Sequence, residues 1–291
     1  MSIILRKDQQ QLAGQLAVLF TAILWSSSGL FVKLLEWHPI VIASLRSYVA
    51  VFFLLIIRFI YPPPSGSKNA PLPLWIGACS FSFTMLSFVI ANRITTAANA
   101  IMLQYSAPIW AAFLAWWLIK EKPRLEHWGA LVMVFSGMVL FFQDALGSGA
   151  IVGDLLGFAS GVSFGLYSVL LRKIKDSNPQ DIMLLGHAVT AFLGIPFIIL
   201  YPPSLGISSV TIILYMGIIQ IGLTSILFVY GMKRVRAIQA MLIAAVEPIL
   251  NPVWVVIFIG ERPSLTALVG GAIIIATVIA SSIIGWRRAE Q

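Results

Sequence analysis

Ten long apolar stretches, separated by short links, constrain this chain more than any other feature of its sequence. About 20 consecutive apolar residues suffice for a helix to cross a membrane, where a helix satisfies its own backbone hydrogen bonds. Only 10% of the 291 residues are Asp, Glu, Lys or Arg, whereas a soluble domain carries about 25%. A soluble fold is therefore excluded. The sequence predicts an all-α membrane protein with ten transmembrane helices, at 13–34, 39–60, 74–92, 97–119, 126–143, 151–172, 180–201, 209–231, 237–259 and 265–285.

The positive charges are distributed unevenly along the links. With ten spans, 15 Lys and Arg residues lie on the side of both tails, 3 lie on the other side, and Arg46 lies within a span. Cytoplasmic loops carry such an excess, so we expect both termini in the cytoplasm of a bacterial cell and the chain in its cytoplasmic (inner) membrane. The net charge of +8 is thereby an orientation signal, and nucleic acid is not an expected partner. The short links leave no room for a soluble catalytic domain.

The sequence repeats itself at a spacing of 140 residues. Tyr61-Pro62-Pro63 recurs as Tyr201-Pro202-Pro203, and Glu121-Lys122-Pro123 recurs as Glu261-Arg262-Pro263. The repeat predicts two halves, 1–145 and 146–291, that form one transport unit of two five-helix repeats. Because five is odd, the second half enters the membrane from the opposite side. Inverted repeats of this kind are typical of secondary transporters, although a duplication retained only for packing would leave the same pattern.

Several short motifs occur in an order and spacing that resemble a known family. They are Leu24-Trp25-Ser26-Ser27-Ser28 in the first span, Arg46 in the second, and Ala107-Pro108 and Glu247-Pro248 in the fourth span of each half, which ends at Glu121 or Glu261. Over nearly its whole length the chain resembles the drug/metabolite transporter superfamily, EamA type. The resemblance implies a secondary carrier, often an exporter, for small metabolites such as amino acids or other organic solutes.

Glu247 is the one acidic residue deep within a predicted span. It lies about 10 residues from the start of span 237–259, which is roughly 15 Å at 1.5 Å per residue and near the midplane. Ionisable groups at this depth are costly and mark functional sites by default. We take Glu247 as a candidate for proton coupling, or as a site for a cationic substrate. The alternative is a structural acid paired with a helix N-terminus or with Arg46.

Prolines predict that the fourth helix of each half is bent. Proline has no N–H, so Pro108, Pro248 and Pro252 release the carbonyls of Gln104, Ala244 and Pro248. Carbonyls freed at membrane depth are tolerated where they line a cavity or find other partners. We therefore expect these two helices to contribute to a central site.

Further polar and aromatic residues are candidates for lining this substrate site, because binding cavities combine apolar surface with a few placed polar groups. Thr84 and Thr224, each with a polar residue one turn earlier, form matching strips on the third helix of each half. For each residue the alternative is ordinary packing or hydrogen bonding between helices. The candidates for substrate binding are Trp25, Arg46, Ser80, Thr84, Gln104, Tyr105, Tyr167, Gln220, Thr224, Asn251 and Trp254.

Two further patterns are interpreted without a chemical role. Gly153, Gly157, Gly161 and Gly165 recur every four residues and predict a smooth helix face that another helix approaches closely. His187 is a lone histidine, interpreted as structural. With one cysteine and no paired histidines, no metal site and no cofactor are expected.

The function predicted from these features is secondary active transport by alternating access, in the direction of export, with proton coupling as a hypothesis. The expected partners are a small-molecule substrate and the lipid bilayer. A facilitative uniporter, a channel or a lipid scramblase is the alternative. An enzyme acting within the membrane through Glu247, His187 or Arg46 is disfavoured, because no nucleophile and base stand at a recognisable spacing.

Overall fold

The computed structural model describes residues 7–62, 71–95, 97–143, 150–259 and 264–287; within them, the side chains of some helical residues are not described. Every regular element in these ranges is a helix, in agreement with the prediction. The helices are α1 Lys7–Ser26, α2 Ser28–Lys33, α3 Pro39–Ile60, α4 Pro71–Ile94, α5 Ala97–Gln104, α6 Ala107–Ile119, α7 Leu125–Phe142, α8 Ile151–Lys173, α9 Gln180–Leu193, α10 Ile195–Leu200, α11 Ile207–Tyr215, η1 Met216–Leu223, α12 Thr224–Arg234, α13 Ala237–Ala244, α14 Glu247–Ile259 and α15 Leu265–Arg287.

The apolar helices match the ten predicted spans. Among the described residues, seven helical stretches are long and apolar enough to cross a membrane, and shorter apolar helices cover Leu125–Phe141, Ala237–Leu250 and Leu268–Ile284. Large apolar side chains remain exposed along the outside, for example Phe52, Phe59 and Trp117, as expected where hydrocarbon replaces water. The chain is an integral membrane protein.

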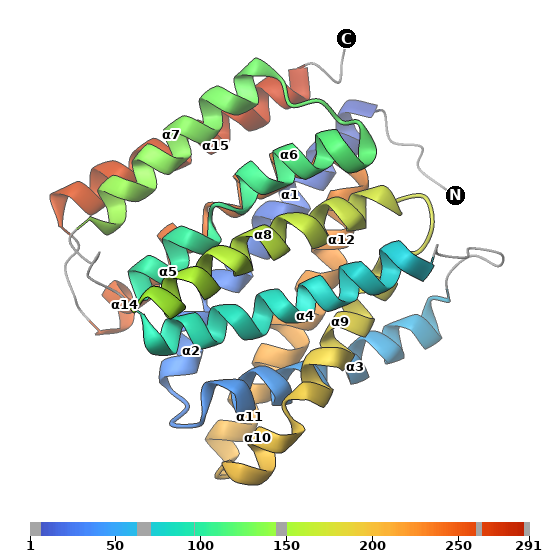
Figure 1. Ribbon diagram of the computed structural model, residues 1–291, viewed down its shortest axis with the longest axis vertical. Coiled ribbons are helices and arrows are strands. Elements are labelled where there is room, and N and C mark those ends of the chain that lie inside the picture. The colour runs from blue at the N-terminus through green and yellow to red at the C-terminus, as the bar shows by residue number, and fades with distance from the viewer. Residues whose placement is uncertain (1–6, 63–70, 96, 144–149, 260–263, 288–291) are drawn as a thin grey trace.

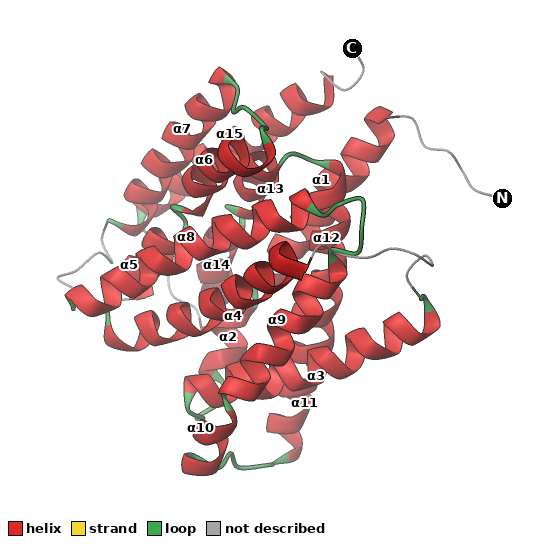
Figure 2. Cartoon of the chain, turned by 45° about the vertical axis from the view of Figure 1, so that its right-hand side comes forward, coloured by secondary structure: helices red, strands yellow, loops and turns green. Residues whose placement is uncertain are grey.

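The helices form one bundle in which α8 runs through the middle (Figure 1). It packs between α4 on one side and α5 and α6 on the other, while α7 and α15 lie side by side at one edge. Helices α10 and α11 lie at the end away from α7 and α15, as a second view also shows (Figure 2). The start of α1 and the end of α15 lie on the same side of the molecule.

Both fourth helices are interrupted, not merely bent as predicted. Residues 105–106 separate α5 from α6, and residues 245–246 separate α13 from α14. The two breaks lie 140 residues apart, and each ends two residues before a proline, Pro108 or Pro248. The missing proline N–H removes one helical bond at the same place in each half.

Two spans that the sequence predicts as continuous are also interrupted. Helix α1 ends at Ser26 and α2 begins at Ser28, and α9 and α10 are separated at Gly194. Pro196 lies at the start of α10, so the second interruption has the same local cause as the breaks in the fourth helices. No proline lies at Ser27. A further irregularity is the π-helical stretch η1 in the span 207–234.

The glycines at positions 153, 157, 161 and 165 form a stripe along α8, and α5 and α6 pack closely against this stripe. A methyl group on Gly161 would come within 2.8 Å of the carbonyl oxygens of both Leu103 and Gln104, and one on Gly165 within 2.9 Å of the backbone nitrogen of Ala111. The prediction of a closely approached helix face is confirmed. Only glycine lets α8 lie against the broken segment, where the carbonyl released by Pro108 is located.

Candidate functional site

A hydrogen bond joins the breaks of the two fourth helices. Tyr105 lies in the first break, and its hydroxyl donates to Glu247 Oε2 at 2.6 Å. Glu247 is the first residue of α14, directly after the second break. The tyrosine is only 5% exposed, whereas Glu247 is half-buried. Two residues predicted separately, Glu247 as an acid deep in a span and Tyr105 as a candidate for lining the substrate site, therefore meet in the fold.

The same hydroxyl also lies near the carbonyl that Pro248 releases. The Tyr105 hydroxyl is 3.3 Å from the carbonyl oxygen of Ala244, the last residue of α13. In a continuous helix that oxygen would accept from the backbone N–H of residue 248, which proline lacks. Tyr105 therefore faces the two acceptors at the second break.

Arg46 on α3 interacts electrostatically with Glu247 and with His187. Among the described residues it forms neither a hydrogen bond nor an ion pair with any side chain, and it is half-buried. An unpaired guanidinium in the hydrocarbon would cost several kcal/mol. Glu247 is the carboxylate whose charge acts on Arg46, without a direct ion pair between them.

The Trp-Ser-Ser motif at the end of α1 is a centre of hydrogen bonds. Trp25 Nε1 donates to Thr224 Oγ1 at 2.9 Å, and Ser26 Oγ accepts from Trp254 Nε1 at 2.8 Å. Ser27 Oγ accepts from Gln220 Nε2 at 3.3 Å. Three consecutive residues thus bind three of the predicted site residues, and the interruption between α1 and α2 lies among them.

Gln220 leaves one polar atom available at this centre. Its Oε1 is buried and has no hydrogen-bond partner among the described residues, and the residue is 1% exposed. Gln220 lies in η1, where the wider helical turn changes the direction of the following side chains. Buried polar groups nearly always have a hydrogen-bond partner, so this oxygen is a candidate acceptor for a group other than the described side chains.

An aromatic wall adjoins these residues. The ring of Trp25 lies 6.2 Å from that of Phe164 and 5.2 Å from that of Phe228, and Tyr167 stacks on Phe164 at 5.2 Å. Tyr167 also interacts electrostatically with Glu247. The wall begins beside the serine centre at Trp25, and Tyr167 lies within electrostatic range of Glu247.

Other predicted residues make hydrogen bonds between helices. Gln104 Nε2 donates to Ser160 Oγ at 2.8 Å, and Ser160 donates to the carbonyl of Thr84 at 3.2 Å. The carbonyl of Ser80 accepts from Ser163 at 2.9 Å. These three residues lie where α4, α5 and α8 pack together. The side chains of Asn251 and Pro252 lie outside the described part of the structure, as do residues 260–263 with Glu261.

His187 is buried between two serines. Its Nδ1 lies 3.4 Å from Ser47 Oγ and its Nε2 lies 3.1 Å from Ser225 Oγ, and it is 1% exposed. The described residues contain no group of three His, Cys, Asp or Glu side chains that could hold a metal ion.

A charged network at the ends of the helices was not among the predicted site residues. Arg172 at the end of α8 binds Glu121 Oε1 at 2.9 Å, and also donates to the carbonyls of Met232 and Lys233. Arg236 donates to the carbonyl of Lys122 at 3.4 Å. The link after α6 is thereby attached to the ends of α8 and α12. Two features of the sequence could have indicated this network: the cation Arg172 at the end of a span, and the repeated motif that begins at Glu121.

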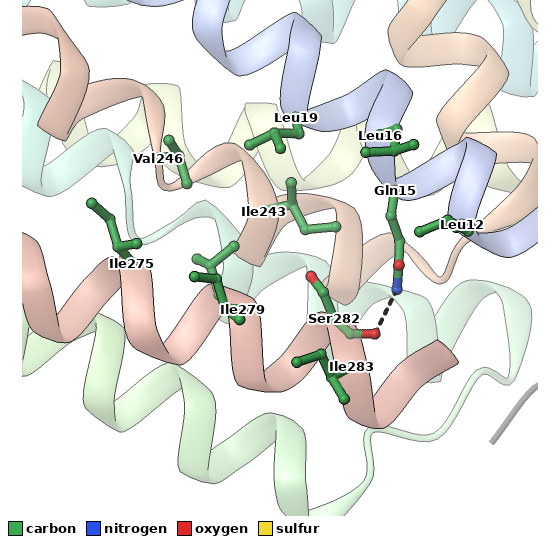
Figure 3. A pocket seen from close by; sticks show the side chains of 11 residues that line it. Leu12, Gln15, Leu16, Leu19, Ile243, Val246, Ile275, Ile279, Ser282 and Ile283 are labelled. Carbon is green, nitrogen blue, oxygen red and sulfur yellow. Dashed lines mark hydrogen bonds between the residues drawn. The ribbon is translucent and has the colours of Figure 1, made fainter. Parts of the chain in front are cut away.

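An apolar groove lies beside the second break. Leu12, Leu16, Ile243, Val246 and Ile279 line much of it, and its volume is about 370 Å³. Figure 3 shows that it lies between α1, α13 and α15. The hydrogen bond from Gln15 to the carbonyl of Ser282, at 2.9 Å, joins its two sides. Val246 directly precedes Glu247, so the groove reaches the break itself.

The model of the EamA-like transporter family matches residues 12–143 and again residues 151–283. The chain belongs to this family. A transporter of Archaeoglobus fulgidus, named as uncharacterized, is 25% identical over 94% of this chain and 96% of its own. The transporter YwfM of Bacillus subtilis, also named as uncharacterized, is 26% identical over 92% and 93%.

Human solute carrier family 35 member G1 is 23% identical over 96% of this chain and 81% of its own. A solved crystal structure superposes with a TM-score of 0.81 at 20% identity, covering 94% of this chain and 99% of that one, which shows a shared fold. The family and the names of these relatives indicate a membrane transporter.

Proposed function

We propose that this EamA-like transporter is a secondary active carrier that exports small metabolites, such as amino acids or related organic solutes, by alternating access coupled to protons at Glu247. The observation that carries the proposal is the Tyr105–Glu247 bond between the two interrupted helices. Discontinuous helices near the midplane are where secondary transporters bind substrates and coupling ions. Arg46 adds a cation that would suit a carboxylate, and Glu247 adds an anion that would suit an amine.

Alternating access rests on the proposal that 1–145 and 146–291 are inverted halves. Its support is the double match to the family model and the two breaks 140 residues apart. The Arg172–Glu121 network joins residues of both halves at the end of α8. We take it as a closure of the cytoplasmic side, in the inner membrane with both termini inside, as the asymmetry of 15 against 3 positive charges indicates.

A lipid scramblase or a facilitative path for amphipathic molecules is the second candidate. The groove of about 370 Å³ favours it, because the groove is apolar and reaches the break beside Glu247. A headgroup near Glu247 with a chain in the groove would be its substrate.

The test begins with thermal stability of the purified protein against amino acids, nucleosides, amines and organic acids at two pH values, because a ligand that binds only the folded state raises stability. Any hit is then assayed in lipid vesicles, with a pH gradient and by counterflow. Glu247→Gln is expected to abolish gradient-driven transport and to spare counterflow. Glu126→Gln, which alters an acid in the Arg124 ion pair at the start of α7, is the control and retains both.

Full gradient-driven transport by Glu247→Gln would refute the coupling. Movement of fluorescent phospholipids between leaflets, with no stabilising metabolite, would instead favour the scramblase.

A further inference from the structure

Tyr105 has one hydroxyl proton and faces two acceptors. Glu247 Oε2 lies 2.6 Å from its oxygen and the Ala244 carbonyl oxygen lies 3.3 Å from it. The acceptors belong to the two sides of the second break, because Ala244 ends α13 and Glu247 begins α14. A hydroxyl donates one hydrogen bond at full strength and accepts up to two.

The choice of acceptor depends on the charge of Glu247. An ionised carboxylate only accepts, and a bond to a charged group is about twice as strong as one between neutral groups. The proton of Tyr105 then points at Glu247, and the Ala244 carbonyl has no helical donor because residue 248 is proline. A protonated Glu247 becomes a donor. Its O–H donates to the tyrosine oxygen, and the tyrosine proton turns to the Ala244 carbonyl.

We propose that Tyr105 is a positioning residue whose hydroxyl changes its hydrogen-bond acceptor when Glu247 is protonated. The change alters the hydrogen bonding at the break between α13 and α14. The inference rests on the proposed proton coupling at Glu247. When Glu247 is ionised, Tyr105 of the first break is hydrogen-bonded to α14 alone. When Glu247 is protonated, the same side chain is hydrogen-bonded to Ala244 of α13 and to Glu247 of α14. Proton uptake thereby links the two ends of the interrupted helix.

The surroundings of Glu247 fit this role. Among the described residues, the ionisable groups that interact with it are Tyr105 from the first break, Arg46 from α3 and Tyr167 from α8. Arg46 and Tyr167 act on it through electrostatics. Of the three, Tyr105 alone makes a hydrogen bond to the carboxyl. Removing its hydroxyl therefore removes the one link that changes direction with the proton.

The test is an infrared titration of the purified protein in lipid vesicles, which uses the proton as its probe and needs no substrate. The C=O band of protonated Glu247 is identified by its absence in Glu247→Gln. In Tyr105→Phe the carboxylate loses a donor, so the band is expected to appear at a pH about 1 to 2 units higher than in the wild type. Tyr230→Phe, whose ring lies 3.4 Å from the Arg234 guanidinium, is the control and should keep the wild-type midpoint.

A second variant keeps the ring and the hydroxyl. Replacement of Tyr105 by 3-fluorotyrosine gives a more acidic phenol and a stronger donor to the carboxylate, so the midpoint is expected to move to lower pH. An unchanged midpoint in both Tyr105 variants, with an intact Glu247 band, overturns the role of Tyr105 and leaves coupling at Glu247 standing. Opposite shifts in the two variants support the role of Tyr105, and the transport assay of Glu247→Gln tests the coupling separately.

Discussion

Gly161 provides a sharp test of how closely α8 packs on the broken helix. In Gly161→Ala the new methyl carbon would lie 2.8 Å from the carbonyl oxygens of Leu103 and Gln104. These are backbone atoms, so each would have to move by about 0.6 Å to reach an ordinary contact of 3.4 Å. Overpacking costs about 1 to 3 kcal/mol, and we take the upper value because backbone must move. Alanine has a helix propensity about 1 kcal/mol better than that of glycine, so the free energy of unfolding falls by about 2 kcal/mol in total.

Gly157 is the matched control one turn earlier on the same stripe. Its methyl group would meet Ala100 at 3.4 Å, an ordinary contact, so Gly157→Ala keeps the gain of up to about 1 kcal/mol. At about 2 °C per kcal/mol, we expect the apparent melting temperature in detergent to fall by about 4 °C in the first variant and to rise by up to about 2 °C in the second. Equal shifts, or a stable Gly161→Ala, would refute the argument.

Two further predictions concern the charged residues and the topology. Arg172→Met should lower the free energy of unfolding by about 3 kcal/mol, because it leaves the mostly buried Glu121 and two carbonyls unpaired; Arg58→Met, which removes the more exposed ion pair with Asp181, should cost about 1 kcal/mol or less. Equal melting temperatures would contradict this difference. In a Cys79→Ala background, a cysteine at Lys175 should react with an impermeant maleimide from the cytoplasmic side, and one at Arg93 from the outside. Labelling of both from one side would exclude the proposed topology.

The sequence predicts the ten spans and the fourth-helix irregularities because these follow from local chemistry. Composition is sufficient for the spans, and a missing N–H is sufficient for Pro108 and Pro248. Pro196 could have indicated the interruption at Gly194 in the same way, but the sequence analysis predicts a continuous helix over 180–201. The interruption at Ser27 has a local contribution of another kind, because the hydroxyls of Ser26 and Ser27 donate to the carbonyls of Ile23 and Leu24 at 2.6 and 2.7 Å and so compete with the helical bonds. The bond from Gln220 to Ser27, 193 residues apart in the sequence, could not be predicted locally.

The sequence predicts many residues of the candidate site, but it does not predict the hydrogen bonds between them. Glu247 and Tyr105 were both candidates, but their direct bond depends on how two breaks 140 residues apart face each other. The Gln104 side chain bonds across a helix interface and the Thr84 side chain bonds within its own helix, uses that the sequence alone could not separate from lining a cavity. The Arg172 network depends on three links that meet only in the folded chain.

The Tyr105–Glu247 bond has no counterpart in the other half. The residues 140 positions away are Ala245 and Ala107, and neither carries a polar side chain. If the halves exchange conformations, the exchanged arrangement cannot rebuild this bond, so the inward-facing and outward-facing states differ in free energy even without substrate. The empty carrier would therefore rest mainly on one side of the membrane, and protons would alter the time it spends there.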